Sequence, residues 1–135
     1  MILQSSLLAG LVTFACLLPC GPAQATDFEG AWATDAANCS KIFVKSAKGV
    51  SFAKKADLYG SGFVIAGNKL RGKIASCNIK ARKQEGDIVH FVAVCSTDIA
   101  IDTMQFSLKI LDENKVARVF TAMPELETRY ERCRP

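Results

Sequence analysis

The sequence predicts an all-β domain built as a small antiparallel up-and-down barrel of about eight strands. Short apolar stretches recur between turns rich in glycine, asparagine and aspartate, and helical periodicity is almost absent. Strands linked by hairpins lose their unpaired edges most simply by closing into a barrel, although a β-sandwich is the alternative fold. The chain has 135 residues, and no internal repeat or linker divides it into more than one domain.

The first half of the domain predicts short strands separated by turns. Asp27–Ala33 alternates apolar and polar residues around the only tryptophan, with Phe28 and Trp32 on one face. Asp35 is placed to cap one helical turn that leads to Cys39. The other strands expected in this half are 41–46, 50–53 and 63–66, while 54–59 is ambiguous between loop and strand.

The second half has the strongest strand patterns. Two long strands within 68–97 are joined by a tight turn at Gly86, and 104–110 alternates apolar and polar side chains most cleanly. Further strands are expected over 116–121 and 126–133, after a turn at Asp112–Lys115. The bulky side chains available to fill the barrel are Phe28, Trp32, Phe52, Phe63, Phe91, Met104, Phe106 and Phe120.

The first 25 residues predict a cleavable signal peptide. The apolar run Leu7–Leu18 is followed by Ala23-Gln24-Ala25, the small-x-small pattern that signal peptidase recognises. The run is too short to span a bilayer comfortably. We therefore expect cleavage after Ala25, a mature domain over 26–135 without a transmembrane segment, and a periplasmic or secreted location.

The cysteines predict two disulfides, because an even number in a small exported domain usually forms bridges. Cys77 lies as far before Gly86 as Cys95 lies after it, so a symmetric hairpin brings the two face to face. This pairing leaves Cys39 to bridge Cys133. Short Cys-x-x-Cys or Cys/His spacing is missing from the mature sequence, so no metal site is expected.

Positive charge is concentrated between Lys41 and Lys83, where only Asp57 opposes the basic residues. Such a segment is typical either of a surface for an anionic partner or of a solvated face that balances acidic flanks, and the solvated face is favoured. The residues expected to form an anion-binding surface, if there is one, are Lys69, Arg71, Lys73, Lys80 and Arg82.

No catalytic pattern is recognisable. His90 is the only histidine and shares a strand face with Ile88 and Val92, and the sequence places no nucleophile or carboxylate beside it. Gly-x-Ser-x-Gly, phosphate-binding and dinucleotide-binding motifs are missing. We therefore expect a protein that is not an enzyme and has no cofactor. Nucleic acid is also excluded, because the chain is exported and offers few aromatic residues for base stacking.

Gly30-x-Trp32 on the first strand resembles the Gly-x-Trp start of lipocalins and of the avidin-like barrels. In the lipocalin pattern a basic residue from the closing strand lies over that tryptophan, and the resemblance implies this role for Arg129 or Arg132. The same start with a cysteine soon after is also similar to the small periplasmic inhibitors of secreted metalloproteases, which are barrels of this size.

The mature chain as a whole resembles an uncharacterised family of small exported proteins from Gram-negative bacteria. The residues that carry this resemblance are Trp32-Ala33-x-Asp35, Cys39, the hairpin cysteine pair and the closing Tyr130-x-Arg132-Cys133. The resemblance implies a disulfide-stapled barrel and brings no known activity.

These observations favour a non-enzymatic exported binding module. An aromatic-lined barrel interior or rim would hold a small apolar or amphiphilic ligand, and the basic segment would hold an anionic head group. The residues expected to bind the ligand are Trp32, Phe63, Phe91, Phe106 and Arg129. The alternative is a periplasmic protein-binding inhibitor of a protease or lysozyme, or an envelope interaction protein, which presents loops or Thr26–Glu29 to its partner.

Overall fold

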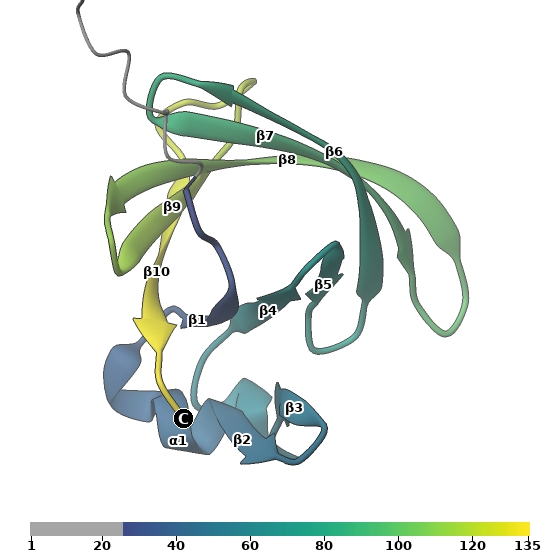
Figure 1. Ribbon diagram of the computed structural model, residues 1–135, viewed down its shortest axis with the longest axis vertical. Coiled ribbons are helices and arrows are strands. Elements are labelled where there is room, and N and C mark those ends of the chain that lie inside the picture. The colour runs from purple at the N-terminus through teal and green to yellow at the C-terminus, as the bar shows by residue number, and fades with distance from the viewer. Residues whose placement is uncertain (1–25) are drawn as a thin grey trace, which may run out of the picture.

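The computed structural model describes residues 26–135, and these form a closed antiparallel barrel of eight strands (Figure 1). The strand order is β1-β10-β9-β8-β7-β6-β5-β4, so the barrel predicted from the sequence is confirmed in preference to the sandwich. The predicted signal peptide lies outside the described residues. The elements are β1 (Gly30–Ala33), η1 (Ala36–Asn38), α1 (Cys39–Ile42), β2 (Phe43–Ser46), β3 (Gly49–Phe52), η2 (Ala56–Leu58), β4 (Gly62–Ala66), β5 (Lys69–Arg71), β6 (Ser76–Glu85), β7 (Ile88–Ser96), β8 (Ile101–Asp112), β9 (Lys115–Val119) and β10 (Glu127–Cys133).

Alternate side chains of the strands point into the barrel and form its core. On β7, Phe91, Ala93 and Cys95 are buried and the residues between them are half-buried, as expected for a strand with one face inward. The Phe91 ring stacks on Phe106 with centroids 4.9 Å apart and meets Phe28 edge-on at 5.5 Å. This aromatic packing fixes the β7–β8 wall against the segment that precedes β1.

The β6–β7 hairpin has the predicted turn and the predicted disulfide. Gly86 adopts a φ of 63°, which glycine accepts without steric cost, and Cys77 lies directly opposite Cys95 with Cα atoms 3.9 Å apart. The expectation of one continuous strand before this turn is wrong. The loop Gly72–Ala75, closed by a 2.9 Å backbone hydrogen bond, separates the short β5 from β6.

The chain between β1 and β4 forms a compact insertion on the outer face of the barrel. It contains η1, α1, the β2–β3 hairpin and η2, and Figure 1 shows α1 beside the C-terminal end of β10. Ile42 and Phe43 pack with Ala31 and Val64 in a second apolar cluster, outside the barrel interior. The insertion therefore buries the outward-facing side chains of β1, which explains why this strand is apolar on both faces.

Two sequence expectations are corrected in the insertion. The strand expected over 41–46 is wrong at its first two residues, because α1 makes a helical turn that directs Ile42 into the second cluster before β2 begins. Phe52 does not fill the barrel. Its ring packs against Phe43, with centroids 5.1 Å apart, within the insertion.

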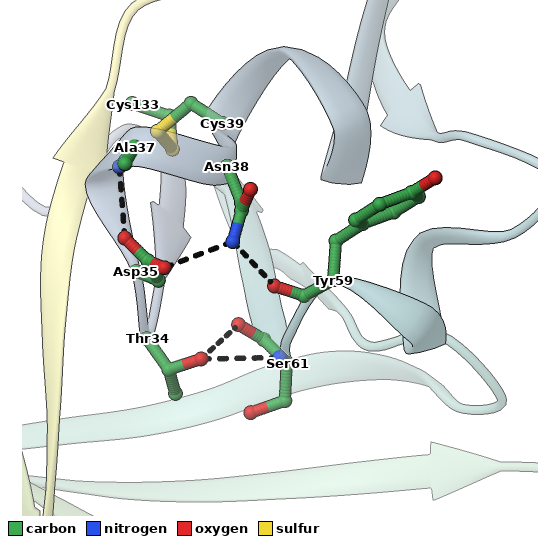
Figure 2. Close-up of a disulfide and its surroundings, with 8 residues drawn as sticks. All are labelled: Thr34, Asp35, Ala37, Asn38, Cys39, Tyr59, Ser61 and Cys133. Carbon is green, nitrogen blue, oxygen red and sulfur yellow. Dashed lines mark hydrogen bonds between the residues drawn. A yellow bond between two sulfur atoms is a disulfide. The ribbon is translucent and has the colours of Figure 1, made fainter.

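Hydrogen bonds join the two ends of the insertion, and a disulfide links it to the barrel (Figure 2). Thr34 Oγ1 accepts a hydrogen bond from the Ser61 N–H at 3.1 Å and donates to the Ser61 carbonyl at 3.2 Å. The Asp35 carboxylate caps η1, as the sequence predicts. The disulfide between Cys39 and Cys133 joins the insertion to the last strand, which confirms the second predicted pairing.

The two bridges fit an oxidising location outside the cytoplasm, where disulfides persist. Within residues 26–135, no helix combines the length and the apolar character required to cross a bilayer.

Candidate functional site

The two ends of the barrel are built differently, and each is named here after one residue. At the Trp32 end lie the segment before β1 and the β4–β5, β6–β7 and β8–β9 turns. At the Arg118 end lie the β5–β6 loop (72–75), the β7–β8 loop (97–100) and the β9–β10 loop (120–126). Antiparallel strands alternate in direction, so successive connections fall at alternate ends.

At the Trp32 end the tryptophan is buried and the inward-facing arginine is fully engaged. Trp32 is 1% exposed, and its indole Nε1 donates to the Phe28 carbonyl at 3.0 Å. The Arg132 guanidinium lies 4.3 Å from the centroid of the Trp32 ring. It donates to the backbone carbonyls of Asp27 (2.8 Å), Glu29 and Glu113 (3.3 Å). Of the two arginines that the sequence left open, Arg132 is the one that covers the tryptophan.

A hollow of about 500 Å³ lies beside this cluster and is bordered by Thr26, Phe28, Ile110 and the cluster residues themselves. Its cation is Arg132, which already binds three carbonyl groups. Its remaining charged lining is acidic, from Asp27, Asp112 and Glu113. An anionic ligand therefore gains little there.

The Arg118 end contains a cavity of about 190 Å³ in the barrel interior, and this cavity is partly open to solvent. Most of its lining is apolar, because the alternation of strands β4 to β10 directs aromatic and aliphatic side chains inward. Among residues 26–135, Arg118 is the only charged residue on the lining. The lining residues are Gly62, Phe63, Leu70, Gly72, Ala75, Cys77, Cys95, Met104, Phe106, Leu108, Arg118 and Tyr130.

The barrel wall is incomplete beside this cavity, because β9 pairs with only the second half of β8. The last residue of β9 lies opposite Ser107, so within residues 26–135 the segment Ile101–Phe106 is paired with β7 alone. Met104, on the cavity lining, is 42% exposed at this gap. A second hollow of about 250 Å³, beside the β9–β10 loop, shares Phe106 and Arg118 with the cavity.

Arg118 is the residue that sequence reasoning missed. It is half-buried, and its guanidinium lies 5.1 Å from the centroid of the Phe120 ring. Across the described residues, no hydrogen bond or ion pair engages this guanidinium. The signal that would have identified it is the alternation Val116-Ala117-Arg118-Val119-Phe120, which places a cation on the same strand face as Val116 and Phe120.

Only two of the five predicted ligand-binding residues lie on the cavity lining. Phe63 and Phe106 line the cavity. Trp32 and Phe91 are buried in the core and are not part of the cavity lining. Arg129 is exposed, and its Nε donates to Glu127 at 2.7 Å, away from the cavity.

The basic residues predicted as an anion-binding surface are largely engaged in holding the fold together. Arg71 donates to a carbonyl of β3 at 2.6 Å, and Lys73 donates to two carbonyls of the insertion at 3.1 and 3.2 Å. Arg82 donates to the β4–β5 turn at 2.5 Å and lies over the Phe91 ring at 5.5 Å. Lys69 and Lys80 are exposed. Three of the five predicted cations thus act as tethers between elements.

The structure places two partners beside His90 that the sequence did not reveal. Its Nδ1 is 2.7 Å from Ser107 Oγ, and its Nε2 is 3.2 Å from Glu85 Oε2. Lys83 binds Glu85 at 2.6 Å, and this hydrogen bond and its charge lower the pKa of Glu85, with a smaller effect from His90. Ser107 faces His90 only through the β7–β8 register, which the sequence does not specify.

The order Ser107–His90–Glu85 is that of a hydrolase triad, but its setting is different. A nucleophilic serine needs an accessible oxygen and donors aimed at the reacting carbonyl. Ser107 is 8% exposed and lies within a paired strand, with His90 opposite it on one side and Val119 on the other. We interpret the three residues as a hydrogen-bonded chain on the outer face of the sheet.

Within residues 26–135, no three His, Cys, Asp or Glu side chains are grouped so that they could hold a metal ion. Comparisons with protein-family models, curated proteins and solved structures find no match for the chain.

Proposed function

We propose that the protein is a non-enzymatic binding module that holds a small apolar or amphiphilic molecule in the cavity at the Arg118 end. The observation that supports this proposal is the cavity of about 190 Å³, lined mostly by apolar side chains, within the barrel. An apolar molecule placed there gains dispersion contacts and leaves water, and both effects favour binding.

The ligand reaches the cavity through the incomplete wall beside β8. Met104, which is 42% exposed, borders the cavity at this gap. No strand has to separate for a small molecule to enter at the unpaired edge of Ile101–Phe106.

The binding module acts outside the cytoplasm, in the periplasm or as a secreted protein, after cleavage behind Ala25. The apolar segment before that residue, its small-x-small end and the two disulfides support this location. The denatured mass of the exported protein tests both points. We expect a chain that begins at Thr26 and lacks four hydrogens from its cysteines, whereas a retained leader or free thiols would contradict the proposal.

Native mass spectrometry of the protein exported from its own host tests ligand binding. We expect a discrete adduct that is released on denaturation. Ala75→Phe, which fills the cavity mouth, should abolish the adduct, whereas Ala81→Phe on the exposed outer face of β6 should retain it. A bare wild-type protein that also takes up no added small alcohol would refute the binding function.

A protein partner is the second candidate function, and one observation favours it. The unpaired edge of β8 carries the exposed Ile101, and Ile99 in the preceding loop is 95% exposed. A free strand edge with exposed apolar residues can pair with an extended segment of another protein. A periplasmic inhibitor or an envelope interaction protein could bind its partner in this way.

The two functions predict different effects of one substitution. Thr103→Pro places a proline ring on the β8 edge, where the Thr103 N–H donates to Asp102 Oδ1 at 2.7 Å, and obstructs pairing with another strand, whereas the cavity-lining side chains stay in place. Loss of a crosslinked periplasmic complex with an unchanged small-molecule adduct would favour the partner. The reverse result would favour the cavity.

A further inference from the structure

We propose that the ligand of the interior cavity is a small monocarboxylate, with its carboxylate bound by Arg118 and its apolar part among the aromatic side chains. This inference rests on the binding function proposed above and adds the chemical class of the ligand. It starts from Arg118, the single charged residue on the cavity lining.

The other inward-facing or half-buried arginines of the barrel are satisfied by the protein. Arg71 donates to the Val50 carbonyl, Arg82 to the Gly67 carbonyl, and Arg132 to three backbone carbonyls. Arg118 alone among these has no hydrogen bond or ion pair within residues 26–135. A cation in apolar surroundings is costly unless a partner of opposite charge meets it.

A carboxylate is the partner that fits this arginine best. A guanidinium presents two parallel N–H groups, which match the two oxygens of a carboxylate. A phosphate dianion needs more than one cation, and the cavity lining supplies only Arg118. The same lining includes Tyr130, whose hydroxyl makes no hydrogen bond within residues 26–135 and is available as a further donor.

The cavity limits the size of the apolar part. A volume of about 190 Å³ corresponds to about six water-sized groups, below the range of typical drug-binding pockets. Phe63 and Phe106 line this space, with Phe63 edge-on to Tyr130 at 5.0 Å. A short aliphatic or single-ring acid fits this space, and a long acyl chain would extend through the gap beside Met104.

The test compares three probes of equal chain length: hexanoate, 1-hexanol and hexylammonium. Each is titrated into the ¹⁵N-labelled oxidised protein, and the amide shifts in two-dimensional NMR spectra give both the affinity and the location. We expect hexanoate to bind the wild-type cavity at least tenfold more tightly than hexanol, about what one charge-assisted contact supplies. Hexylammonium should bind more weakly than hexanol.

Arg118→Gln should remove the preference for hexanoate and leave the hexanol affinity within about twofold, because the apolar lining is kept. The matched control is Arg129→Gln, which removes an exposed arginine from the neighbouring strand and should preserve the preference. Tyr130→Phe should reduce the preference by a smaller factor.

The possible failures are distinct. If hexanol and hexanoate bind the wild-type cavity equally, the carboxylate inference is wrong and the binding function stands. A preference that survives in Arg118→Gln shows that another group binds the anion and also overturns the inference. If neither probe shifts residues of the cavity, the binding function itself is refuted.

Discussion

Arg132 and Arg118 both project inward from the closing strands of the barrel, yet the protein uses them in opposite ways. Arg132 lies over Trp32 and donates to three backbone carbonyls. These hydrogen bonds hold the segment before β1 against the β8–β9 turn. Arg118 contacts the Phe120 ring and has no other partner within the described residues.

The difference between the two ends separates stability from binding. The Trp32 end buries its largest side chain and satisfies its polar groups, which is what a structural cluster requires. Within residues 26–135, the Arg118 end keeps a cavity, an unpaired strand edge and a cation without a hydrogen bond or ion pair, each of which costs stability. Groups that cost stability and are retained in a small domain are candidates for function.

The largest expected loss of stability comes from removing the disulfides, which differ in position and in loop length. Cys39 and Cys133 are 94 residues apart, whereas Cys77 and Cys95 on the cavity lining are 18 apart. In the chain-entropy model, Cys39→Ser with Cys133→Ser should cost about 4.6 kcal/mol and Cys77→Ser with Cys95→Ser about 3 kcal/mol. Urea unfolding followed by circular dichroism measures both losses. If removing Cys77–Cys95 costs as much as removing Cys39–Cys133, or more, then the cavity-side disulfide stabilises the protein by more than the closure of its loop.

Trp32→Ala should cost about 3–5 kcal/mol, because it empties a fully buried site. Phe106→Ala at the other end should cost about half as much, since Phe106 is half-buried and already borders a cavity. The same urea titrations measure the two losses. Similar values would mean that the Arg118 end is as tightly packed as the Trp32 end.

The arginines give the most direct contrast. Arg132→Met should destabilise the protein by about 2 kcal/mol, because three carbonyls lose a charged donor. Arg118→Met should leave the free energy of unfolding unchanged or raise it, because no partner is left unsatisfied and a half-buried cation without an ion pair is removed. A large loss in Arg118→Met would show that its contact with Phe120 has a structural role and would weaken the ligand proposal.

The smallest effect concerns Glu85 on the outer face. Because the bond to Lys83 lowers its pKa, the ionised carboxylate favours the folded state above the unfolded pKa, and this stabilisation is lost as pH falls through the folded pKa. Lys83→Met should raise the pKa of Glu85 toward its ordinary value of 4.5, as measured by ¹³C NMR titration of the side-chain carboxyl. Lys80→Met, a nearby exposed lysine, should leave it unchanged.

Sequence reasoning succeeded where the determining contacts are local. The symmetric spacing of Cys77 and Cys95 about Gly86 predicted a hairpin and its bridge, because a two-strand turn fixes the register on its own. The alternation around Met104–Ile110 likewise predicted β8, although the strand extends further at both ends.

Features that depend on the register between different hairpins were missed. Ser107 meets His90, and β9 stops short of Met104, only because of how β8 pairs with both of its neighbours. The sequence could not say whether Arg71 and Lys73 face solvent, because their acceptors lie in the insertion, about 20 residues earlier in the chain. Arg129 is predicted from its place on the closing strand, whereas the alternation along β9 is the signal that identifies Arg118 as the cation of the cavity.

Trp32 has a consequence beyond packing, because it is the only tryptophan of the chain. The intrinsic fluorescence therefore reports on a single point, with a cation over one ring face and the Phe63 ring stacked 6.2 Å away. Phe63 also lines the cavity, so an occupant is sensed through one intervening ring. The fluorescence of Trp32 should therefore report unfolding of the Trp32 end directly and occupancy of the cavity indirectly, through Phe63.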